Sequence, residues 1–531
     1  MKTRINDVKI IDGSGAESFS GSVLIDGDRI AAVDHGTAVS ETADVVLNGR
    51  GRCLAPGFID THSHSDLESI VHPDLLPKVR QGITTEFLGQ DGISMAPLPE
   101  QYIAPWRKNL AGLDGVSDAF DWRYRDTAGY LKCIEAAGAS TNTAYLVPHG
   151  NVRMEAMGLD DRPPTKEELE RMKKIVAREM EAGAYGLSTG LIYIPCAYAA
   201  TEELIELCRV VASYGGRFVV HQRSEADTVI PSMQEILRIG RESGVHVHFS
   251  HFKVCGRKNA RFIPEMLRLL HEAQAEGIEI SFDQYPYAAG STMLGVLLPP
   301  WAHDGGTEKL MERLQDPSLR ARMVRDIENG IPGWDNFMDF AGADQIFVTS
   351  VQTDANQDVV GKSLTDIAKL RGKTVYDALF DLLYEEKNAV GMVDFYGDEA
   401  QVERFMQEDC MNACTDGLLG GKPHPRVYGA FPRILRKYVR EKPVLTLEKA
   451  VRKLTGQAAD NMGLVDRGYI RPGCFADLVL FNPAMVADKG TFVDPCQYPD
   501  GITMVTVNGR IAWMNGEETL RGRYGRVLYR K

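Results

Sequence analysis

Pro56-Gly57-Phe58-Ile59-Asp60-Thr61-His62-Ser63-His64-Ser65-Asp66-Leu67 is an apolar run that ends in a His-x-His pair. Alternate side chains of a strand point to the same face, so His62 and His64 would project together. Two imidazoles on one face at the carboxyl end of a strand can share a divalent metal ion. Asp60 and Asp66 lie close enough in sequence to orient the two rings. The alternative is two unrelated histidines, so the interpretation depends on the rest of the chain.

Strand and helix patterns alternate from about residue 56 to residue 469. Thr165 to Glu168 form a capping box ahead of an amphipathic helix. Strands are predicted at 183–188, 217–221, 245–251 and 278–283. Repeated strand–helix units over this length predict an α/β protein with a parallel (β/α)8 TIM-like barrel, and a doubly wound sheet is the structural alternative. Helical segments around 300–400 predict an insertion in the barrel.

Both ends of the chain have the pattern of short strands. Residues 22–33 predict a hairpin that turns at Asp26 to Asp28, and further strands are predicted at 476–481, 504–507 and 510–514. We therefore expect a small β-sandwich domain built from residues 1–55 and 470–531, attached to a metal-dependent barrel of residues 56–469. Two separate β appendages are the alternative.

Composition and charge exclude several classes of protein. The chain has 531 residues, of which 44% are hydrophobic and 25% are charged, as in ordinary globular proteins. A net charge of -13 without a long basic run argues against binding to nucleic acid or to an anionic membrane. The sequence contains neither a membrane-spanning apolar run nor an N-terminal signal-peptide pattern. The nine cysteines are scattered without CxxC pairs, which favours the reducing cytoplasm.

Candidate metal ligands fall at the ends of successive predicted strands. After His62 and His64 come His221, His251 and Asp416. Barrel enzymes build their active sites from side chains at the carboxyl ends of the strands, so these five residues are expected to converge. Four imidazoles and one carboxylate can hold one or two divalent ions and leave a position for water. Each residue alone is more often structural, but the ordered set predicts a metal centre.

Several motifs carry a resemblance to a known family: 57-GFIDTHSH-64, 186-GLSTGL-191, 221-HQRSE-225, 250-SHFK-253, 283-DQYPYAAGST-292, 424-HPRVYG-429 and 466-DRGYIRPGCFADL-478. With these motifs the chain resembles the amidohydrolase superfamily and, within it, the D-aminoacylases (N-acyl-D-amino-acid deacylases), over nearly its whole length. The resemblance implies a metal-dependent hydrolase that cleaves N-acyl-D-amino acids to a D-amino acid and a carboxylate. It also implies zinc, as one or two divalent ions, and a small-molecule substrate.

The resemblance also implies a set of metal ligands. They are His62, His64, Asp91, His221, His251 and Asp416. Asp416 would in addition take a proton from water and pass it to the leaving amine. Family members often have Gly-Asn-Cys-Gly with a ligating cysteine, where this chain has Gly89-Gln90-Asp91-Gly92. Asp91 either replaces that cysteine as a ligand or leaves the second metal site weak or empty.

The product of deacylation carries an α-carboxylate that needs a partner when it is buried. Arg426 suits bidentate recognition of a carboxylate, and Lys253 faces the same way as His251 in a strand. By resemblance to the carboxylate-binding group of the family, Tyr193, Ser291, and Tyr285 or Tyr287 are expected to donate further hydrogen bonds. The alternatives are that Arg426 lies on the surface, that the tyrosine rings only pack in the core and that Ser291 is a turn residue.

Two other functions are alternatives to a hydrolase of linear N-acyl-D-amino acids. One is a cyclic-amide hydrolase of the hydantoinase or dihydropyrimidinase kind. The other is a non-catalytic barrel that serves as a scaffold, which the intact ligand set disfavours. Met293, Leu294, Leu297 and Leu298 favour an apolar substrate side chain unless they only pack in the core. A homo-oligomer is possible.

Overall fold

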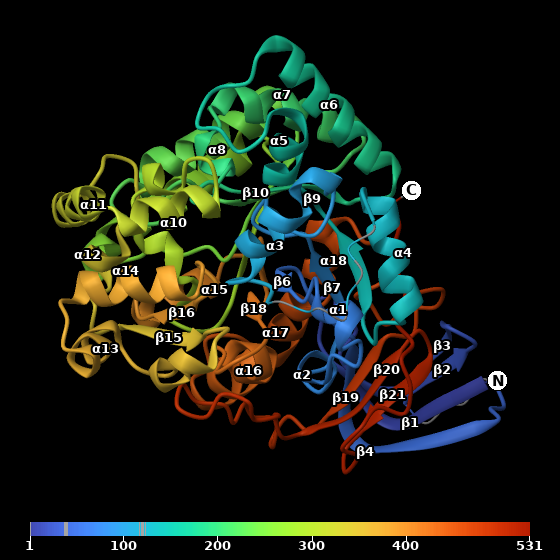
Figure 1. The fold of residues 1–531 in the computed structure, drawn as a ribbon. Helices are drawn as coiled ribbons and strands as arrows, with labels where there is room; N and C mark the ends of the chain where they lie inside the picture. The colour runs from blue at the N-terminus through green and yellow to red at the C-terminus, as the bar shows by residue number, and fades with distance from the viewer. Residues whose placement is uncertain are drawn as a thin grey trace.

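The centre of the molecule is a closed parallel barrel (Figure 1). The computed structural model describes residues 2–36, 41–115, 117, 120, 122 and 124–530. The barrel strands, in order, are β5 (Phe58–Asp60), β7 (Ile83–Leu88), β8 (Asn142–Tyr145) with β9 (Val147–Pro148), β10 (Gly186–Gly190), β11 (Arg217–His221), β12 (His246–Phe249), β13 (Ile280–Gln284) and β17 (Met411–Ala413). β8 pairs with β7 and β9 with β10, so these two pieces act as one strand of the barrel.

The barrel closes where its last strand meets its first. Beyond β17, β18 (Gly417–Leu418) pairs in parallel with β6 (Ser63–His64). The backbone N–H of Asp416 also donates to the carbonyl of His62 at 2.8 Å. The predicted (β/α)8 barrel is confirmed, and its closure places the first and eighth strand ends side by side.

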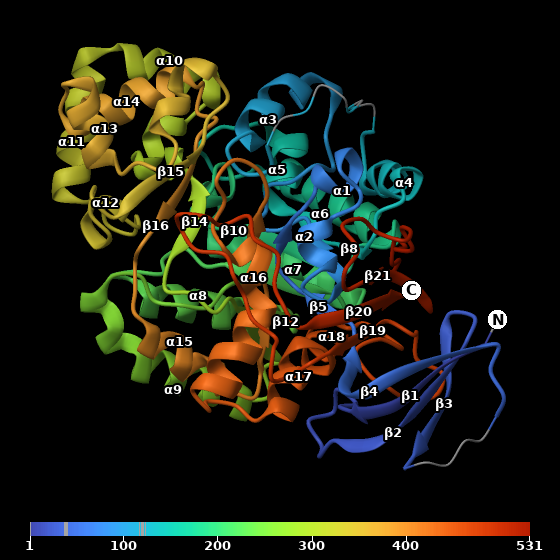
Figure 2. The same ribbon diagram turned by 90° about the horizontal axis from the view of Figure 1, so that it is seen from below.

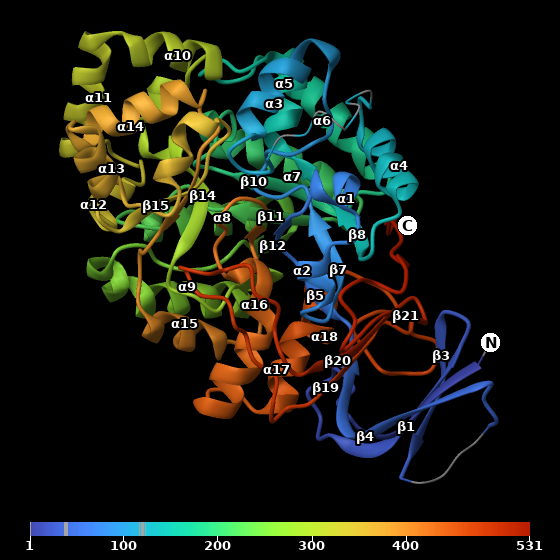
Figure 3. The same cartoon turned by 60° about the horizontal axis from the view of Figure 1, so that its bottom comes forward.

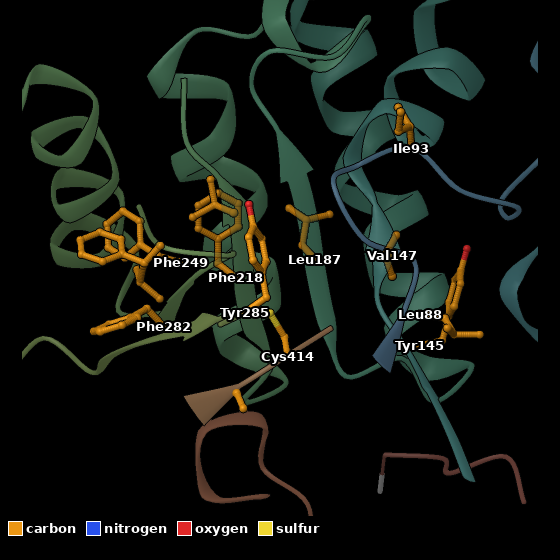
Figure 4. Packing of buried hydrophobic residues seen from close by; sticks show 14 of the residues in the cluster. Leu88, Ile93, Tyr145, Val147, Leu187, Phe218, Phe249, Phe282, Tyr285 and Cys414 are labelled. Atoms are coloured by element: carbon orange, nitrogen blue, oxygen red, sulfur yellow. The ribbon is translucent and has the colours of Figure 1, made fainter. Parts of the chain in front are cut away.

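Helices cover the outside of the barrel because the strands are buried on both faces, as is typical of parallel sheets. Phe282 of β13 packs against Phe405 of the covering helix α15 (Glu399–Met406), with ring centroids 6.4 Å apart. Figure 4 shows Phe282 among neighbouring core side chains. The predicted Thr165–Glu168 capping box is present. The main covering helices are α4 (Thr127–Ala137), α6 (Lys166–Glu181), α7 (Thr201–Ser213), α8 (Val229–Ser243), α9 (Ile263–Ala275), α15 (Glu399–Met406), α16 (Arg426–Arg433), α17 (Leu447–Leu454) and α18 (Gly456–Met462).

The two ends of the chain build a single seven-stranded sheet. Its strands, in spatial order, are β21 (Arg510–Met514), β20 (Ile502–Val507), β19 (Leu478–Phe481), β4 (Val45–Pro56), β1 (Lys2–Ile10), β2 (Phe19–Asp26) and β3 (Arg29–His35). The antiparallel pairing of β19 with β4 joins the two termini. An apolar cluster that includes Ile5, Ile25 and Leu478 belongs to this sheet. The expected β unit from both termini is therefore one continuously hydrogen-bonded sheet.

A separate unit is inserted in the chain between β13 and β17. It contains β14 (Gly290–Met293), β15 (Ile346–Ser350) and β16 (Gly391–Asp394), which form an antiparallel sheet, and the helices α10 (Thr307–Gln315), α11 (Pro317–Asn329), α12 (Phe337–Phe340), α13 (Leu364–Arg371) and α14 (Val375–Glu385). These helices and strands share their own apolar cluster. In Figures 2 and 3 the inserted unit and the N-terminal strands lie on opposite sides of the barrel.

Candidate active site

His62 and His64 face two carboxylates inside the mouth of the barrel. Both rings are buried, and their centroids are 5.2 Å apart. The Nε2 atoms of His62 and His64 lie 3.6 and 3.4 Å from Asp416 Oδ1. The same two atoms lie 3.6 and 3.4 Å from Asp91 Oδ2. The ends of the first, second and eighth strands thus bring two imidazoles between two carboxylates.

His221 and His251 complete this cluster from the fifth and sixth strands. His221 Nδ1 lies 2.9 Å from His251 Nε2, and His251 Nε2 lies 3.9 Å from Asp91 Oδ1. Asp91 therefore faces both pairs of histidines. The ligand atoms of His62, Asp91 and His251 all lie within 4.8 Å of one another, and so do those of His62, His64 and Asp416.

The chemistry of this donor set fits a divalent metal ion. Within the described residues, His62 Nδ1 and Nε2, His64 Nε2, His221 Nε2 and Asp91 Oδ1 are buried and have no hydrogen-bond partner. Buried polar atoms are normally paired, so a group of orphaned atoms that point together requires an explanation. Imidazole nitrogens and carboxylate oxygens are ligand atoms for zinc and similar ions.

Three members of the cluster adopt a left-handed backbone conformation. The φ angles are 56° at Asp91, 35° at His251 and 48° at Asp416. Such angles are uncommon for residues other than glycine, although aspartate and histidine adopt them more often than most side chains. Each costs on the order of 1–3 kcal/mol and persists where the surrounding structure enforces it, which is often at functional sites. The conformation turns these side chains inward just after their strands have ended.

Asp60 and Asp66 support the site differently from the prediction, which was that they orient the histidine rings. Asp60 accepts from Lys78 Nζ and from the backbone N–H of Thr415, both at 2.8 Å. Asp66 accepts from the backbone N–H of Gly89 at 2.9 Å and from the hydroxyl of Ser94. These hydrogen bonds fix the loops that carry Asp416 and Asp91, since each carboxylate accepts from a backbone N–H of the loop itself.

The predicted substrate-binding residues divide into three groups. Tyr193, Lys253, Tyr285 and Ser291 line the same cavity as the histidine cluster. Arg426 lies behind Asp416, with its Nη1 2.9 Å from Asp416 Oδ2 and its Nη2 donating to the carbonyl of Ser291. Tyr287 lies outside the lining of this cavity, where its ring packs against His424 at 4.9 Å.

Two cations flank the ring of Tyr285. The guanidinium carbon of Arg426 is 4.5 Å from the ring centroid, and Lys253 Nζ is 5.9 Å away. Lys253 Nζ also lies 2.7 Å from Glu225 Oε2, and this ion pair outweighs burial in setting the pKa of Lys253 well above its usual value. Lys253 is therefore a cation at every physiological pH, on the cavity wall beside Tyr285.

Sequence reasoning missed three acidic residues around the cavity. Glu225 approaches His251 Nδ1 at 3.2 Å and forms a further candidate ligand group with His221 and His251. Asp394, on β16, lines the cavity and its Oδ2 has no partner among the described residues. Asp335 accepts from the backbone N–H of Glu225 at 2.6 Å. Glu225 lies in the 221–225 motif, four residues after His221, so the sequence could have identified it. Asp335 and Asp394 come from the insertion, where no sequence motif marks them.

Comparison with known proteins gives consistent similarities over nearly the whole chain. The model of the amidohydrolase family matches residues 45–374 and 415–512. A D-aminoacylase of Alcaligenes xylosoxydans xylosoxydans is 36% identical over 98% of this chain and 96% of its own length. An N-acyl-D-aspartate deacylase of the same organism is 34% identical over 98% of this chain and 93% of its own length. The crystal structure of N-acyl-D-glutamate deacylase from Bordetella bronchiseptica, complexed with zinc and a phosphonate inhibitor, is 33% identical and superposes with a TM-score of 0.84 over 99% of both chains.

Proposed function

Because this chain belongs to the amidohydrolase family, we propose that it is a metal-dependent hydrolase of N-acyl-D-amino acids. The reaction would add water across the amide bond and release a D-amino acid and a carboxylate. The observation that carries this proposal is the convergence of four buried histidines and two aspartates beside a wall that bears Lys253. The near-full-length similarity to D-amino-acid deacylases supports both the amide bond and the D configuration.

We assign the metal site to the converging cluster. His62, His64 and Asp416 would hold one ion, and His221, His251 and Asp91 would hold a second, with zinc as the metal. The unpartnered nitrogen and oxygen atoms of these side chains support this assignment. A bound divalent ion supplies Lewis acidity, which lowers the pKa of water and polarises an amide carbonyl.

Asp416 is the proposed general base and acid. Its Oδ2 is held by Arg426, which leaves Oδ1 on the side of the two imidazoles. Burial opposes its charge, but Arg426 and His62 hold the pKa of Asp416 well below its usual value, so the carboxylate is ionised. Asp416 Oδ1 would take a proton from the attacking water and deliver it to the amine nitrogen as the C–N bond breaks.

The substrate's α-carboxylate would lie on the wall that faces Asp416. Lys253 supplies the charge there, and Tyr193, Tyr285 and Ser291 supply hydrogen-bond donors within the same cavity. Arg426 adds a second positive charge behind Tyr285. Tyr287 would act only through its packing, because it lies outside the cavity lining.

Hydrolysis of paired D and L substrates tests the proposal. Purified protein loaded with zinc is expected to hydrolyse N-acetyl-D-amino acids, to lose this activity on chelation and to regain it when zinc is added. Replacing Asp416 by Asn should lower kcat by about 100-fold or more, because proton transfer at Oδ1 is removed. Activity that survives complete metal removal, or hydrolysis of L substrates alone, would contradict the proposal.

The same assay separates the two other functions. A hydantoin or dihydropyrimidine that is opened while linear amides are left intact would select the cyclic-amide hydrolase. Metal binding without turnover of any amide would select the scaffold. The proposed enzyme needs a small-molecule substrate alone, without nucleic acid or membrane as a partner.

We propose a cytoplasmic location on the basis of cysteine chemistry. All nine cysteines are free thiols in the structure, which suits a reducing compartment. Among the described helices, none combines the length and apolar character that a bilayer crossing requires. A homo-oligomer remains a prediction, which sedimentation or light scattering would test.

A further inference from the structure

The barrel interior next to the histidine cluster is polar on one side. His248 of β12 pairs with Ser281 of β13, and Asp283 follows two residues later on the same face of its strand. Phe282, between them, packs outward against Phe405 of α15, so Ser281 and Asp283 point into the barrel. The side chains of His248, Ser281 and Asp283 are completely buried. Barrel interiors are usually filled by branched apolar residues, so these polar side chains require an explanation.

Asp283 joins two of the segments that carry candidate metal ligands. Its Oδ1 accepts from the backbone N–H of His251 at 2.6 Å, and its backbone carbonyl accepts from the N–H of Phe252 at 2.8 Å. Its Oδ2 accepts from the hydroxyl of Thr61, which precedes His62, at 2.9 Å. One residue of the seventh strand therefore holds the backbone of His251 after the sixth strand and the neighbour of His62 after the first.

His248 fixes the carboxylate of Asp283 in turn. Its Nε2 lies 3.0 Å from Asp283 Oδ2, and its Nδ1 lies 2.7 Å from Ser281 Oγ. A carboxylate only accepts hydrogen bonds, so Nε2 carries a hydrogen in either protonation state of the ring. The ring that donates to Asp283 is therefore itself held on its opposite side. His248 and Asp283 both lie outside the lining of the histidine cavity, so they are not placed to contact the substrate.

The contact with Asp283 explains how the backbone conformation of His251 persists. A φ angle of 35° turns His251 out of the extended path of β12. The hydrogen bond from its N–H to a buried carboxylate is charge-assisted and offsets part of the cost of that conformation. The ring centroids of His251 and His62 are 4.9 Å apart, so a shift of either backbone would change the cluster that the two rings share.

We propose that Asp283, kept in place by His248, is a positioning residue of the metal centre. It sets the separation of His251 and His62 and, through that separation, the affinity for metal. This inference rests on the proposed metal site and adds two residues that bind neither the ion nor the substrate. Residues that orient metal ligands in this way typically change metal affinity or activity by about 10- to 100-fold when they are replaced.

The test replaces His248 in the full-length protein and measures zinc binding. His248→Leu removes the donor to Asp283 at similar volume, so we expect at least one zinc dissociation constant to rise at least about tenfold. His248→Gln carries an amide N–H that can replace Nε2–H and should bind zinc nearly as tightly as the parent. Competition with a chromophoric chelator measures the affinities. The visible spectrum of the cobalt-substituted protein reports the ligand geometry, which should change in His248→Leu and not in His248→Gln.

His303→Leu is the matched control. His303 lies in the insertion, where its Nε2 donates to the carbonyl of Gly295 at 3.0 Å, and it is outside the lining of the histidine cavity. This variant should lose stability without weakening zinc binding. The thermal unfolding midpoint separates the two roles. A structural residue lowers the midpoint of the zinc-free and zinc-loaded forms alike, whereas a positioning residue reduces the rise that zinc produces.

The outcomes decide the inference separately from the proposed function. Parent affinities and an unchanged cobalt spectrum in folded His248→Leu, or equal weakening in His248→Gln or His303→Leu, overturn it. If His248→Leu does not fold, Ser281→Ala frees His248 Nδ1 and should weaken zinc binding several-fold, and parent affinity in that variant overturns the inference instead. A parent that binds zinc and hydrolyses no N-acyl-D-amino acid overturns the deacylase alone. A parent that binds no zinc overturns both.

Discussion

Lys78 lies completely buried near the histidine cluster and joins the ends of the first and eighth barrel strands. Its Nζ lies 2.8 Å from Asp60 Oδ2, from Ser63 Oγ and from Thr415 Oγ1. Asp60 in turn accepts from the Thr415 backbone, one residue before Asp416. A buried ion pair is weak evidence for stability, because desolvation offsets its attraction. Its directional bonds instead fix the position of Asp416 relative to His62 and His64.

Replacing Thr415 by Val tests this positioning role at nearly constant volume. The change removes the hydroxyl that bonds both Lys78 and Asp60. We expect kcat to fall at least about tenfold, because small misplacements of catalytic groups are costly, and the free energy of unfolding to fall by about 1–3 kcal/mol. Steady-state kinetics and denaturant unfolding measure the two effects.

The matched control is Thr506→Val in the terminal sheet. Thr506 is also buried, and its hydroxyl donates to the carbonyl of Ala476 and accepts from the backbone N–H of Leu478. This variant should lose similar stability and keep its kcat. If both variants lost kcat equally, the effect of Thr415→Val would come from general destabilisation and the positioning role would be contradicted.

The raised pKa of Asp394 predicts that substrate binding depends on pH. Burial raises its pKa to about 7, against the lowering effect of Lys253 and Arg426. Below pH 7 the side chain is neutral; above pH 7 it is a carboxylate that competes with the substrate's carboxylate for those cations. We therefore expect kcat/KM to fall several-fold between pH 7 and 9, and Asp394→Asn to remove this part of the fall.

Asp398→Asn is the control for this pH profile. Asp398 is an exposed cap of α15, four residues from Asp394 and outside the cavity lining. The Asp398→Asn variant should show the same fall in kcat/KM above pH 7 as the parent enzyme. An Asp394→Asn enzyme whose profile matches that of the parent would assign the decline to another group.

At the scale of elements, the insertion contributes side chains from several of its segments to the cavity of the histidine cluster, and one of these segments carries Asp335. Phe337 lines the cavity of the histidine cluster, and Trp334 lines a neighbouring hollow. Asp335 lies between them and accepts from Ser224 Oγ and from the Glu225 backbone N–H, both at 2.6 Å. Since Glu225 pairs with Lys253, this aspartate connects the insertion to the carboxylate-binding wall.

Replacing Asp335 by Asn should loosen the insertion from the barrel. One of the two hydrogen bonds is lost, so we expect KM for N-acyl-D-amino acids to rise several-fold, kcat to change less and stability to fall by about 1 kcal/mol. Asp381→Asn, which breaks ion pairs with Arg320 and Lys373 elsewhere in the insertion, should lower stability without raising KM. A proportionate fall in kcat with no change in KM would contradict the role of Asp335.

The sequence predicts elements whose signal is local and misses contacts that depend on distant packing. Apolar runs ending in histidine predict β11 at its observed bounds, because strand ends and ligands coincide there. The strand expected to reach His251 ends at Phe249, since His251 adopts a left-handed conformation that periodicity does not encode. Asp335 and Asp394 approach the site only because the insertion folds back onto the barrel. Tyr287 shares its motif with Tyr285, yet the chain direction after β13 turns it outside the cavity.

At the scale of the whole molecule, the candidate ligands come from strand ends all around the barrel. They follow the first, second, fifth, sixth and eighth strands, and they form overlapping groups of candidate ligands that share His62 and His251. Two carboxylates and four imidazoles are buried together there, and several of their atoms have no hydrogen-bond partner in the described chain. Metal binding would therefore connect segments that are more than three hundred residues apart and would favour the folded state over the unfolded chain.

Zinc should accordingly raise the thermal unfolding midpoint of the chelated protein in a concentration-dependent way. Binding to the native state alone adds about 2.7 kcal/mol to the free energy of unfolding when free zinc is 100 times its dissociation constant. Asp91→Ala removes the carboxylate that faces both pairs of histidines, so it should reduce this shift and the bound zinc per chain. Asp466→Ala, at an exposed left-handed position outside the site, should leave the zinc-induced shift unchanged. A midpoint that is indifferent to zinc in the parent, or a full shift in Asp91→Ala, would contradict a metal centre that includes Asp91.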